Sequence, residues 1–249
     1  MAKSFGLEFE GRFAALKNPY DVRGIVTDSG RIIPFGTDTK VLSTVFESIA
    51  RPVVKEVADQ RCLAFHEALR QNVYPDFTLM HDDDDPAKIA VDVKTTYRAG
   101  AEAPVSFTLG SYTSFLRQDH RGIEFPYSQY AEHWIIAFVY SRPLEPPPAD
   151  FYALGDLHDV PPPFSDVEMF TRLKWQLAGA VAGSGNTANI GSRRGTVSEL
   201  RDGAPLFADE TEFLSYWRGY ERTADARARA YSDLAAFRRQ TRPEGKEDA

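Results

Sequence analysis

The sequence contains almost no cysteine and no long apolar run. Cys62 is the single cysteine among 249 residues, so the chain has no internal disulfide and a reducing cytoplasm is its expected location. No apolar stretch approaches the about 18 residues that favour a membrane-spanning helix, and none resembles a signal peptide. We therefore expect a cytoplasmic protein with no membrane partner.

Several common catalytic and nucleotide-binding motifs are also missing. The five histidines have no metal-ligand spacing such as H-x-x-x-H, and there is no G-x-S-x-G elbow. The glycine-rich stretch 183–191 lacks the lysine of a phosphate-binding loop, and its glycines are too widely spaced for a dinucleotide fingerprint. We assign no catalytic role to a histidine. Residues 183–191 form either an ordinary turn or a loop whose amides and hydroxyls read bases.

Acidic residues outnumber basic ones, by 36 to 29. The formal net charge of −7 argues mildly against a nucleic-acid partner, but it does not exclude one, because clustered basic residues decide binding and metal-site acids lower the sum. What the chain does have is apolar material: 43% of its residues are hydrophobic and 12% are aromatic, which is enough for one large domain with a sizeable core.

The most informative stretch runs from Tyr74 to Tyr97. Ile89, Val91 and Val93 alternate with other residues, and this period of two predicts a strand with those three side chains toward a core. The run 74–80 is a second β-rich segment. Four consecutive aspartates lie between the two runs, and we interpret them as the solvated tip of a hairpin.

Pairing of these two runs would create an acidic pocket. Asp76 would approach Asp92, and Lys94 would point from the same strand face as Asp92. Two carboxylates beside one ammonium suit a hard divalent ion, Mg²⁺ first of all, and do not suit zinc. An Asp-x-Lys pair is also common on a solvated strand edge. The spacing Pro75-Asp76, fifteen residues, Asp92-Val93-Lys94 matches the short PD…(D/E)xK signature of a nuclease superfamily.

A helix is predicted before this region. Its pattern runs from Thr39 to Ala50 and ends at a proline, after which a second helix is predicted over 52–69. Lys40 and Glu47 lie on the side opposite the apolar stripe. That side is either a solvated face or a face turned toward the metal pocket or toward DNA, the substrate that a nuclease would bind.

Other segments are simpler to interpret. Residues 20–26 and 31–35 predict a β-hairpin, and the continuous apolar run 134–140 predicts a buried central strand. Two triple-proline runs bracket 150–160, and we interpret them as a lobe boundary. Apolar residues at helical spacing over 213–220 predict a helix.

Longer stretches between about residues 20 and 230 match one known family in a single register. The matching segments include metal, loop and core regions and comprise 20–22, 36–44, 46–47, 51–52, 74–79, 92–97, 107–110, 112–115, 133–136, 182–187, 189–192 and 220–223. On these residues the chain resembles the EcoRV family of type II restriction endonucleases.

The resemblance implies an α+β fold of the PD-(D/E)xK restriction-endonuclease type, with a mixed sheet flanked by helices, in a homodimer. One domain would cover 1–249, with a DNA-binding and catalytic core at about 36–145 and 165–249 and a dimerisation lobe from about 19–35 and 146–164.

The implied activity is Mg²⁺-dependent hydrolysis of double-stranded DNA at a palindromic site, GATATC cut at its centre to blunt ends. A cognate DNA methyltransferase is expected in the same system. Two alternatives stay open: a DNA repair or junction nuclease of the same superfamily, and a DNA-binding protein that does not cleave.

The resemblance also implies roles for individual residues. Asp76, Asp92 and Glu47 would be acids at the metal, and Lys94 would stand beside the attacking water. Base recognition is expected from Gly183, Ser184, Gly185, Asn186 and Thr187. Contacts with the DNA backbone or minor groove are expected from Lys40, Gln71, Asn72, Thr95, Thr113, Ser114, Arg142, Arg222 and Arg227.

Overall fold

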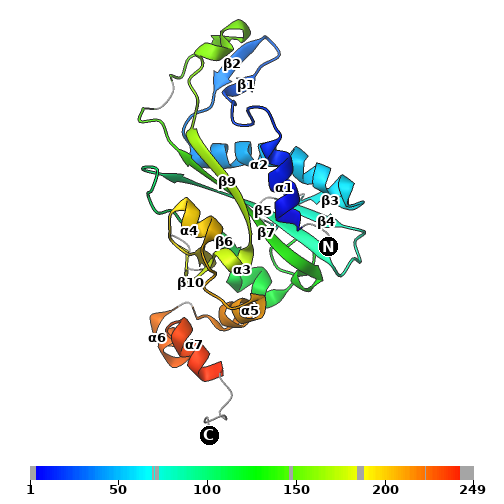
Figure 1. Ribbon diagram of the computed structural model, residues 1–249, viewed down its shortest axis with the longest axis vertical. Helices are drawn as coiled ribbons and strands as arrows, with labels where there is room; N and C mark the ends of the chain where they lie inside the picture. The colour runs from blue at the N-terminus through cyan, green and yellow to red at the C-terminus, as the bar shows by residue number, and fades with distance from the viewer. Residues whose placement is uncertain are drawn as a thin grey trace.

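A five-stranded mixed sheet forms the centre of the protein (Figure 1). The computed structural model describes residues 4–68, 70, 73–145, 148–183, 188–221 and 223–241. The strand order is β3-β4-β5-β7-β9, in which β5 and β7 are parallel and the other neighbours are antiparallel. Their bounds are β3 Ala64–Glu67, β4 Phe77–Met80, β5 Lys88–Arg98, β7 Tyr130–Ser141 and β9 Ser165–Leu173.

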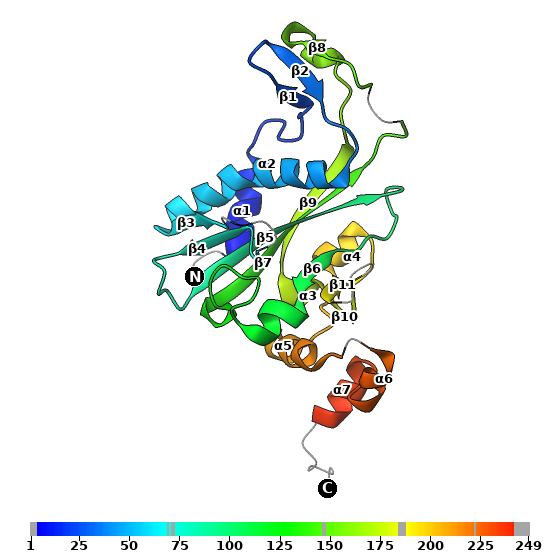
Figure 2. The same cartoon turned by 180° about the vertical axis from the view of Figure 1, so that it is seen from behind.

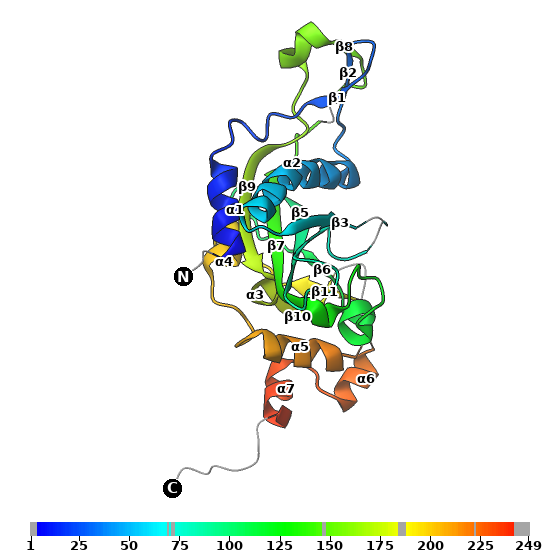
Figure 3. The same cartoon turned by 90° about the vertical axis from the view of Figure 1, so that its right-hand side faces the viewer.

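Both faces of this sheet are buried. Helices α1 (Phe5–Ala14) and α2 (Thr39–Gln60) cover one face, where Ile89, Val91 and Val93 pack as the alternation predicts (Figure 3). Ala90 points into a second core on the other face. The expected buried central strand is β7, whose residues from Trp134 to Tyr140 are all buried.

The second core lies under a small sheet and several short helices. The small sheet has the order β10-β11-β6. The elements on this side are β6 Thr108–Ser111, the π-helical turn η1 Tyr112–Leu116, the 3-10 turn η2 Tyr127–Gln129, α3 Lys174–Leu177, β10 Ala178–Ala182, β11 Asn189–Ser192, α4 Val197–Asp202, α5 Glu210–Gly219, α6 Ala224–Arg229 and α7 Leu234–Thr241. The helix predicted over 213–220 is confirmed as α5.

The predicted helix break at Pro52 is wrong. Helix α2 runs through Pro52 to Gln60, because the proline lies on the exposed side while the buried stripe continues through Val53 and Val57. Packing of that stripe against the sheet outweighs the hydrogen bond that the proline removes.

The helix predicted over 52–69 ends early for a local reason. Cys62 has φ 55°, a left-handed conformation that stops a helix. The chain then forms β3, in which Ala64 pairs with Met80 and Glu67 with Phe77.

The aspartate-rich tip between β4 and β5 is only partly solvated. Asp85 is buried, against the expectation, because its carboxylate accepts hydrogen bonds from the backbone N–H groups of His81 and Ala87, each 2.8 Å long. Lys88, also buried, donates to the carbonyl oxygens of Asp83 and Asp85. The tip is therefore a small hydrogen-bonded turn.

A separate three-stranded sheet projects beyond α2 (Figure 2). It has the order β1-β2-β8, with β1 Gly24–Val26, β2 Arg31–Pro34 and β8 Tyr152–Ala153, followed by the 3-10 helix η3 Leu154–Asp159. The hairpin predicted near residues 20–35 is confirmed, with shorter strands. The division of the chain into a core and a dimerisation lobe stays a prediction.

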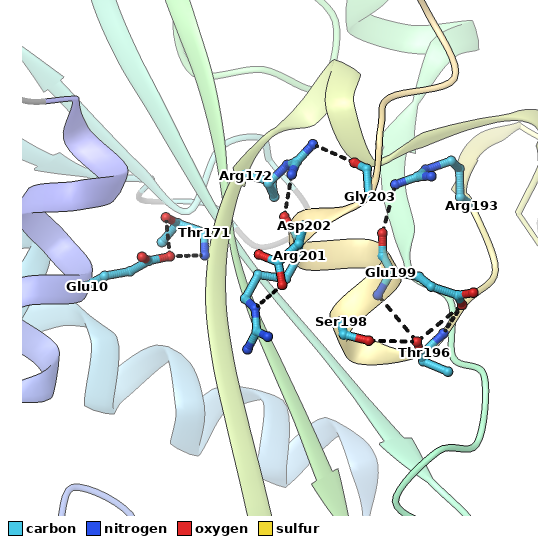
Figure 4. Close-up of polar contacts among 10 residues, drawn as sticks. All are labelled: Glu10, Thr171, Arg172, Arg193, Thr196, Ser198, Glu199, Arg201, Asp202 and Gly203. Carbon is cyan, nitrogen blue, oxygen red and sulfur yellow. Dashed lines mark hydrogen bonds and ion pairs between the residues drawn. The ribbon is translucent and has the colours of Figure 1, made fainter.

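Polar contacts hold α1 and α4 against β9 (Figure 4). The Glu10 carboxylate accepts from the backbone N–H and the hydroxyl of Thr171, at 2.7 and 2.8 Å. Arg172 donates to the backbone oxygens of Arg201 and Gly203 at the end of α4. Within the described residues, no helix combines the length and apolar character needed to cross a membrane.

Candidate active site

The pairing of β4 with β5 places two carboxylates together. Phe77 pairs with Val91, so Asp76, one residue before β4, lies opposite Asp92. The backbone N–H of Val93 donates to Asp76 Oδ2 over 2.7 Å, which fixes the Asp76 side chain at the end of the strand. The hairpin on which the acidic pocket depended is therefore confirmed.

Lys94 completes a compact charged cluster. Its Nζ lies 2.5 Å from Asp92 Oδ2 in an ion pair. Asp92 is 4% exposed and Lys94 is half-buried, so the alternative of a solvated strand edge is wrong. The reason is the second core, which covers the strand face that carries both residues.

A cavity of about 470 Å³ opens over this cluster. The segment just before β4, strand β5, strand β6, the turn η1 and the start of β11 all contribute to its lining. Its lining residues are Val73, Tyr74, Asp76, Asp92, Lys94, Gly110, Ser111, Ser114, Phe115, Gly122 and Asn189.

The pKa values of Asp76 and Lys94 are shifted by burial and by the neighbouring charges. Burial, and next the charge of Asp92, raise the pKa of Asp76 to about 7. Burial alone would lower the pKa of Lys94, but Asp92 and Asp76 outweigh it and raise that pKa above its usual value. Burial and the repulsion between the two carboxylates therefore outweigh the attraction of the single Lys94 ammonium at Asp76.

The donor set fits a hard divalent cation. Asp92 is buried, and its Oδ2 is in contact with the Lys94 ammonium at 2.5 Å, which leaves the second carboxylate of the pair, Asp76, without a charged partner of its own at hydrogen-bond distance among the described residues. The pocket offers carboxylate oxygens and no nitrogen or sulfur ligand from histidine or cysteine. Among the described residues no cluster of three or more His, Cys, Asp or Glu side chains forms a metal site, so other oxygen ligands have to come from water and phosphate.

Glu47 and Lys40 both lie on α2, and the charge of Glu47 interacts with the cluster. Burial raises the pKa of Glu47, and Lys94, Asp92 and Glu67 all act on its charge. Glu47 is half-buried and is electrostatically coupled to the cluster, whereas Thr44 and Arg51 on the same side of α2 are exposed. Lys40 is exposed in the first turn of α2, next to the cap Asp38.

Similarity to known proteins extends over most of the chain. The family model described as restriction endonuclease EcoRV matches residues 16–242. A relative from Escherichia coli, the type II restriction enzyme EcoRV, is 43% identical over 220 residues, which cover 88% of this chain and 90% of the relative. The chain belongs to the EcoRV family of restriction endonucleases. It is a type II restriction enzyme, a DNA-binding nuclease that hydrolyses DNA.

In this EcoRV-family enzyme the base of the expected recognition loop adjoins the cavity. The N–H of Gly183 donates to the Asn189 carbonyl over 2.8 Å, which closes the loop between β10 and β11. Asn189 pairs with Ser111 of β6, and both residues line the cavity. Ser184, Gly185, Asn186 and Thr187 lie outside the described residues.

The residues expected to contact the DNA backbone fall into two groups. Thr95 follows Lys94 on β5, Thr113 Oγ1 lies 3.1 Å from Ser111 Oγ, and Ser114 lines the cavity. These three are therefore at or beside the site, with side chains that are half-buried.

Two of the three expected arginines lie on aromatic rings. The Arg142 guanidinium is 4.8 Å from the centre of the Tyr97 ring, and that of Arg227 is 5.4 Å from the centre of the Tyr220 ring. Gln71, Asn72 and Arg222, the remaining members of the expected set, lie outside the described residues.

Sequence reasoning missed the floor of the cavity. Tyr74, Phe115 and Gly110 form it, and the Tyr74 hydroxyl hydrogen-bonds His133 Nδ1 at 2.8 Å. Burial holds the pKa of His133 well below its usual range, which agrees with its having no role as an acid or base. Only Tyr74 could have been inferred from the local sequence, because it directly precedes Pro75-Asp76. Gly110 and Phe115 come from a distant segment of the chain.

Proposed function

We propose that the enzyme cleaves double-stranded DNA in a Mg²⁺-dependent reaction, with Asp76, Asp92 and Lys94 as the cleavage centre. One observation carries this: two carboxylates and one ammonium converge at the wall of a cavity. Two carboxylates beside one ammonium favour a further cation, and oxygen ligands select a hard one.

Each residue then has a definable task. Asp76 and Asp92 would hold the ion, which when bound neutralises charge on the phosphate and acidifies water. Lys94, whose pKa is raised, stays protonated near neutrality and can orient an attacking water through its N–H donors while adding positive charge near the phosphate. Glu47 would act as a further acid at the edge of the site.

Plasmid cleavage by matched aspartate variants tests this centre. Asp92→Ala is expected to lose at least about a thousandfold in rate with Mg²⁺, since both ion binding and the Lys94 contact are removed. Asp83→Ala is the control, because that carboxylate is exposed on the same hairpin and only its backbone oxygen is used. Comparable cleavage by both variants would exclude Asp92 from the centre.

We infer that the recognition site is GATATC, cut at its centre to blunt ends. The support is family membership together with the loop base, which lies against the same β6 strand that lines the cleavage cavity. Loop residues Gly183 to Thr187 would read outer bases, and the central TA step would be selected by its easy deformation.

Duplex binding in Ca²⁺ tests that assignment without cleavage. A duplex with GATATC should bind more tightly than one with an outer base pair exchanged, by about 1–3 kcal/mol for one good bidentate contact. Equal affinities at matched salt would contradict direct reading at that base pair.

We also propose a homodimer, which a palindromic site requires. The β1-β2-β8 sheet, which projects beyond α2, exposes apolar side chains: Ile25 is 56% exposed and Val26 is 55% exposed. Beside it is an apolar groove of about 470 Å³, lined by Val22, Ile25, Phe35, Val41, Thr44, Val45, Ser48 and Ile49. Such a patch is typical of a protein interface.

Sedimentation of an interface variant tests the dimer. Ile25→Glu should shift the protein toward the monomer, whereas Leu7→Glu, at an exposed position on α1, should not. Sedimentation of Ile25→Glu as a dimer at the lowest measurable concentration would place the interface elsewhere. A cognate DNA methyltransferase remains an expected partner of the system.

A further inference from the structure

Lys174 is a buried lysine whose ammonium group has no hydrogen-bond acceptor in the described part of the chain. It is the first residue of α3, it is 1% exposed, and its Nζ is fully buried. An ammonium without an acceptor is unfavourable in a protein interior, and such groups are more often explained by function than by stability.

The surroundings of Lys174 place it directly beneath the cavity floor. Its Nζ lies 4.1 Å from the centre of the Tyr74 ring and 4.5 Å from that of Phe115, and the two rings stack on each other. A Cβ added to Gly110, which has φ +90°, would be 3.6 Å from Nζ. Tyr74, Phe115 and Gly110 all line the cavity, so the ammonium is separated from it by one layer of atoms.

The charge of Lys174 is coupled to the charges in the cavity. Burial lowers its pKa to about 7, Asp92 opposes this more than any other charge, and Lys94 acts in the same direction as burial. Glu210, at the start of α5, also favours the charged form. Charges interact strongly across such a dry layer, because water does not screen them.

Lys88 is a second buried lysine, and its ammonium has the hydrogen-bond acceptors that Lys174 lacks within the described ranges. Lys88 is 0% exposed, and its Nζ donates to the backbone oxygens of Asp83 and Asp85 and to Gln129 Oε1. Those acceptors account for its burial. Lys174 has no such set among the described residues, although it is equally buried.

We propose that Lys174 is a positioning residue for DNA cleavage, which fixes the cavity floor through Tyr74 and Phe115 and supplies positive charge beneath a bound phosphate. The inference rests on the proposed cleavage centre above that floor. With a pKa of about 7, Lys174 is partly charged near neutrality, and a bound phosphate favours its ammonium form. That ammonium attracts the phosphate anion and stabilises the extra negative charge that develops during hydrolysis. It also repels a divalent cation held by Asp76 and Asp92, so it sets the balance between ion and phosphate binding.

The matched pair Lys174→Met and Lys88→Met tests this proposal. Lys174→Met should melt at a higher temperature than the wild type, because it removes a buried ammonium that no hydrogen bond compensates, and Met can keep packing on the two rings. It should bind Ca²⁺ without DNA about 3–10-fold more tightly by calorimetry, and cleave about tenfold or more slowly at saturating Mg²⁺. Lys88→Met should melt lower, with ion affinity and cleavage rate unchanged.

Each outcome decides for or against Lys174. Ion affinity and cleavage rate within about twofold of the wild type would overturn the proposal, because an ammonium so close to the site must act on its charges. If Lys174→Met does not fold, Lys174→Gln removes the same charge at similar length, and failure of both to fold would make Lys174 a structural residue. Asp92→Ala, measured in parallel, separates the failure of the proposed cleavage centre from the failure of the Lys174 proposal. Full cleavage by Asp92→Ala would rule out the proposed centre. An unchanged Ca²⁺ affinity of Lys174→Met without DNA, beside a cleavage-deficient Asp92→Ala, would rule out only the role of Lys174.

Discussion

Replacing Asp76 by asparagine should abolish cleavage and at the same time stabilise the metal-free enzyme. The folded site raises the pKa of Asp76 from 3.8 to about 7, mainly through burial and the neighbouring Asp92. At 1.36 kcal/mol per pKa unit, ionised Asp76 costs the fold roughly 4 kcal/mol at pH 8. Because the side chain is only partly buried and opens on the cavity, solvent reduces this, and we expect a gain of about 2 kcal/mol.

The sign of the pH dependence follows from the raised pKa. Above pH 7 the carboxylate is ionised in the folded and unfolded chains, so its full cost is present, and below the unfolded value of 3.8 the cost is absent. The advantage of Asp76→Asn should therefore shrink between pH 8 and pH 5, to roughly two fifths. The amide oxygen of the new side chain can still accept from Val93 N–H, so the local backbone geometry is retained.

Thermal unfolding in a chelator at the two pH values measures this. At pH 8 the variant should melt about 4–8 °C above the wild type, given about 2–4 °C per kcal/mol for a chain of this size. Added Mg²⁺ should stabilise the wild type and leave the variant unchanged. A variant that is less stable at pH 8, or whose advantage grows toward pH 5, would refute the electrostatic reasoning.

Two further predictions concern the side chains that would act on water and bases. Lys94→Ala should lose most activity, and Lys94→Arg should also be poor, because a planar guanidinium does not replace a compact ammonium beside one water; near-normal single-turnover rates for the arginine variant would show that charge alone suffices. Asn186→Ala should lose discrimination at one adenine, by roughly 1–3 kcal/mol in competition cleavage assays, and unchanged discrimination would make the loop structural.

The grouping of Asp76, Asp92 and Lys94, the proposed cleavage centre, was predictable because its signals are local. The alternation of Ile89, Val91 and Val93 sets the register of β5, and a hairpin with β4 then brings Asp76 to Asp92 without knowledge of the remaining fold. The spacing of Pro75-Asp76 and Asp92-x-Lys94 added the superfamily signature. The resemblance supplied the distant residues, such as the loop from Gly183 to Thr187.

Features that depend on tertiary packing could not be predicted from the local sequence pattern. Pro52 predicts a break, yet the buried stripe on either side keeps α2 continuous. Asp85 belongs to an acidic run that predicts solvation, but two backbone donors draw it inward. Lys174 comes close to the cavity floor only because α3, which follows β9, meets η1 across the second core, and no spacing in the sequence records that meeting.

Sequencing the ends of a plasmid digested by the purified enzyme tests the central claim most directly. The account predicts blunt ends at the centre of every GATATC, produced with Mg²⁺, lost in chelator and lost in Asp92→Ala. Staggered ends, cutting at another sequence, or undiminished cutting in chelator would contradict it.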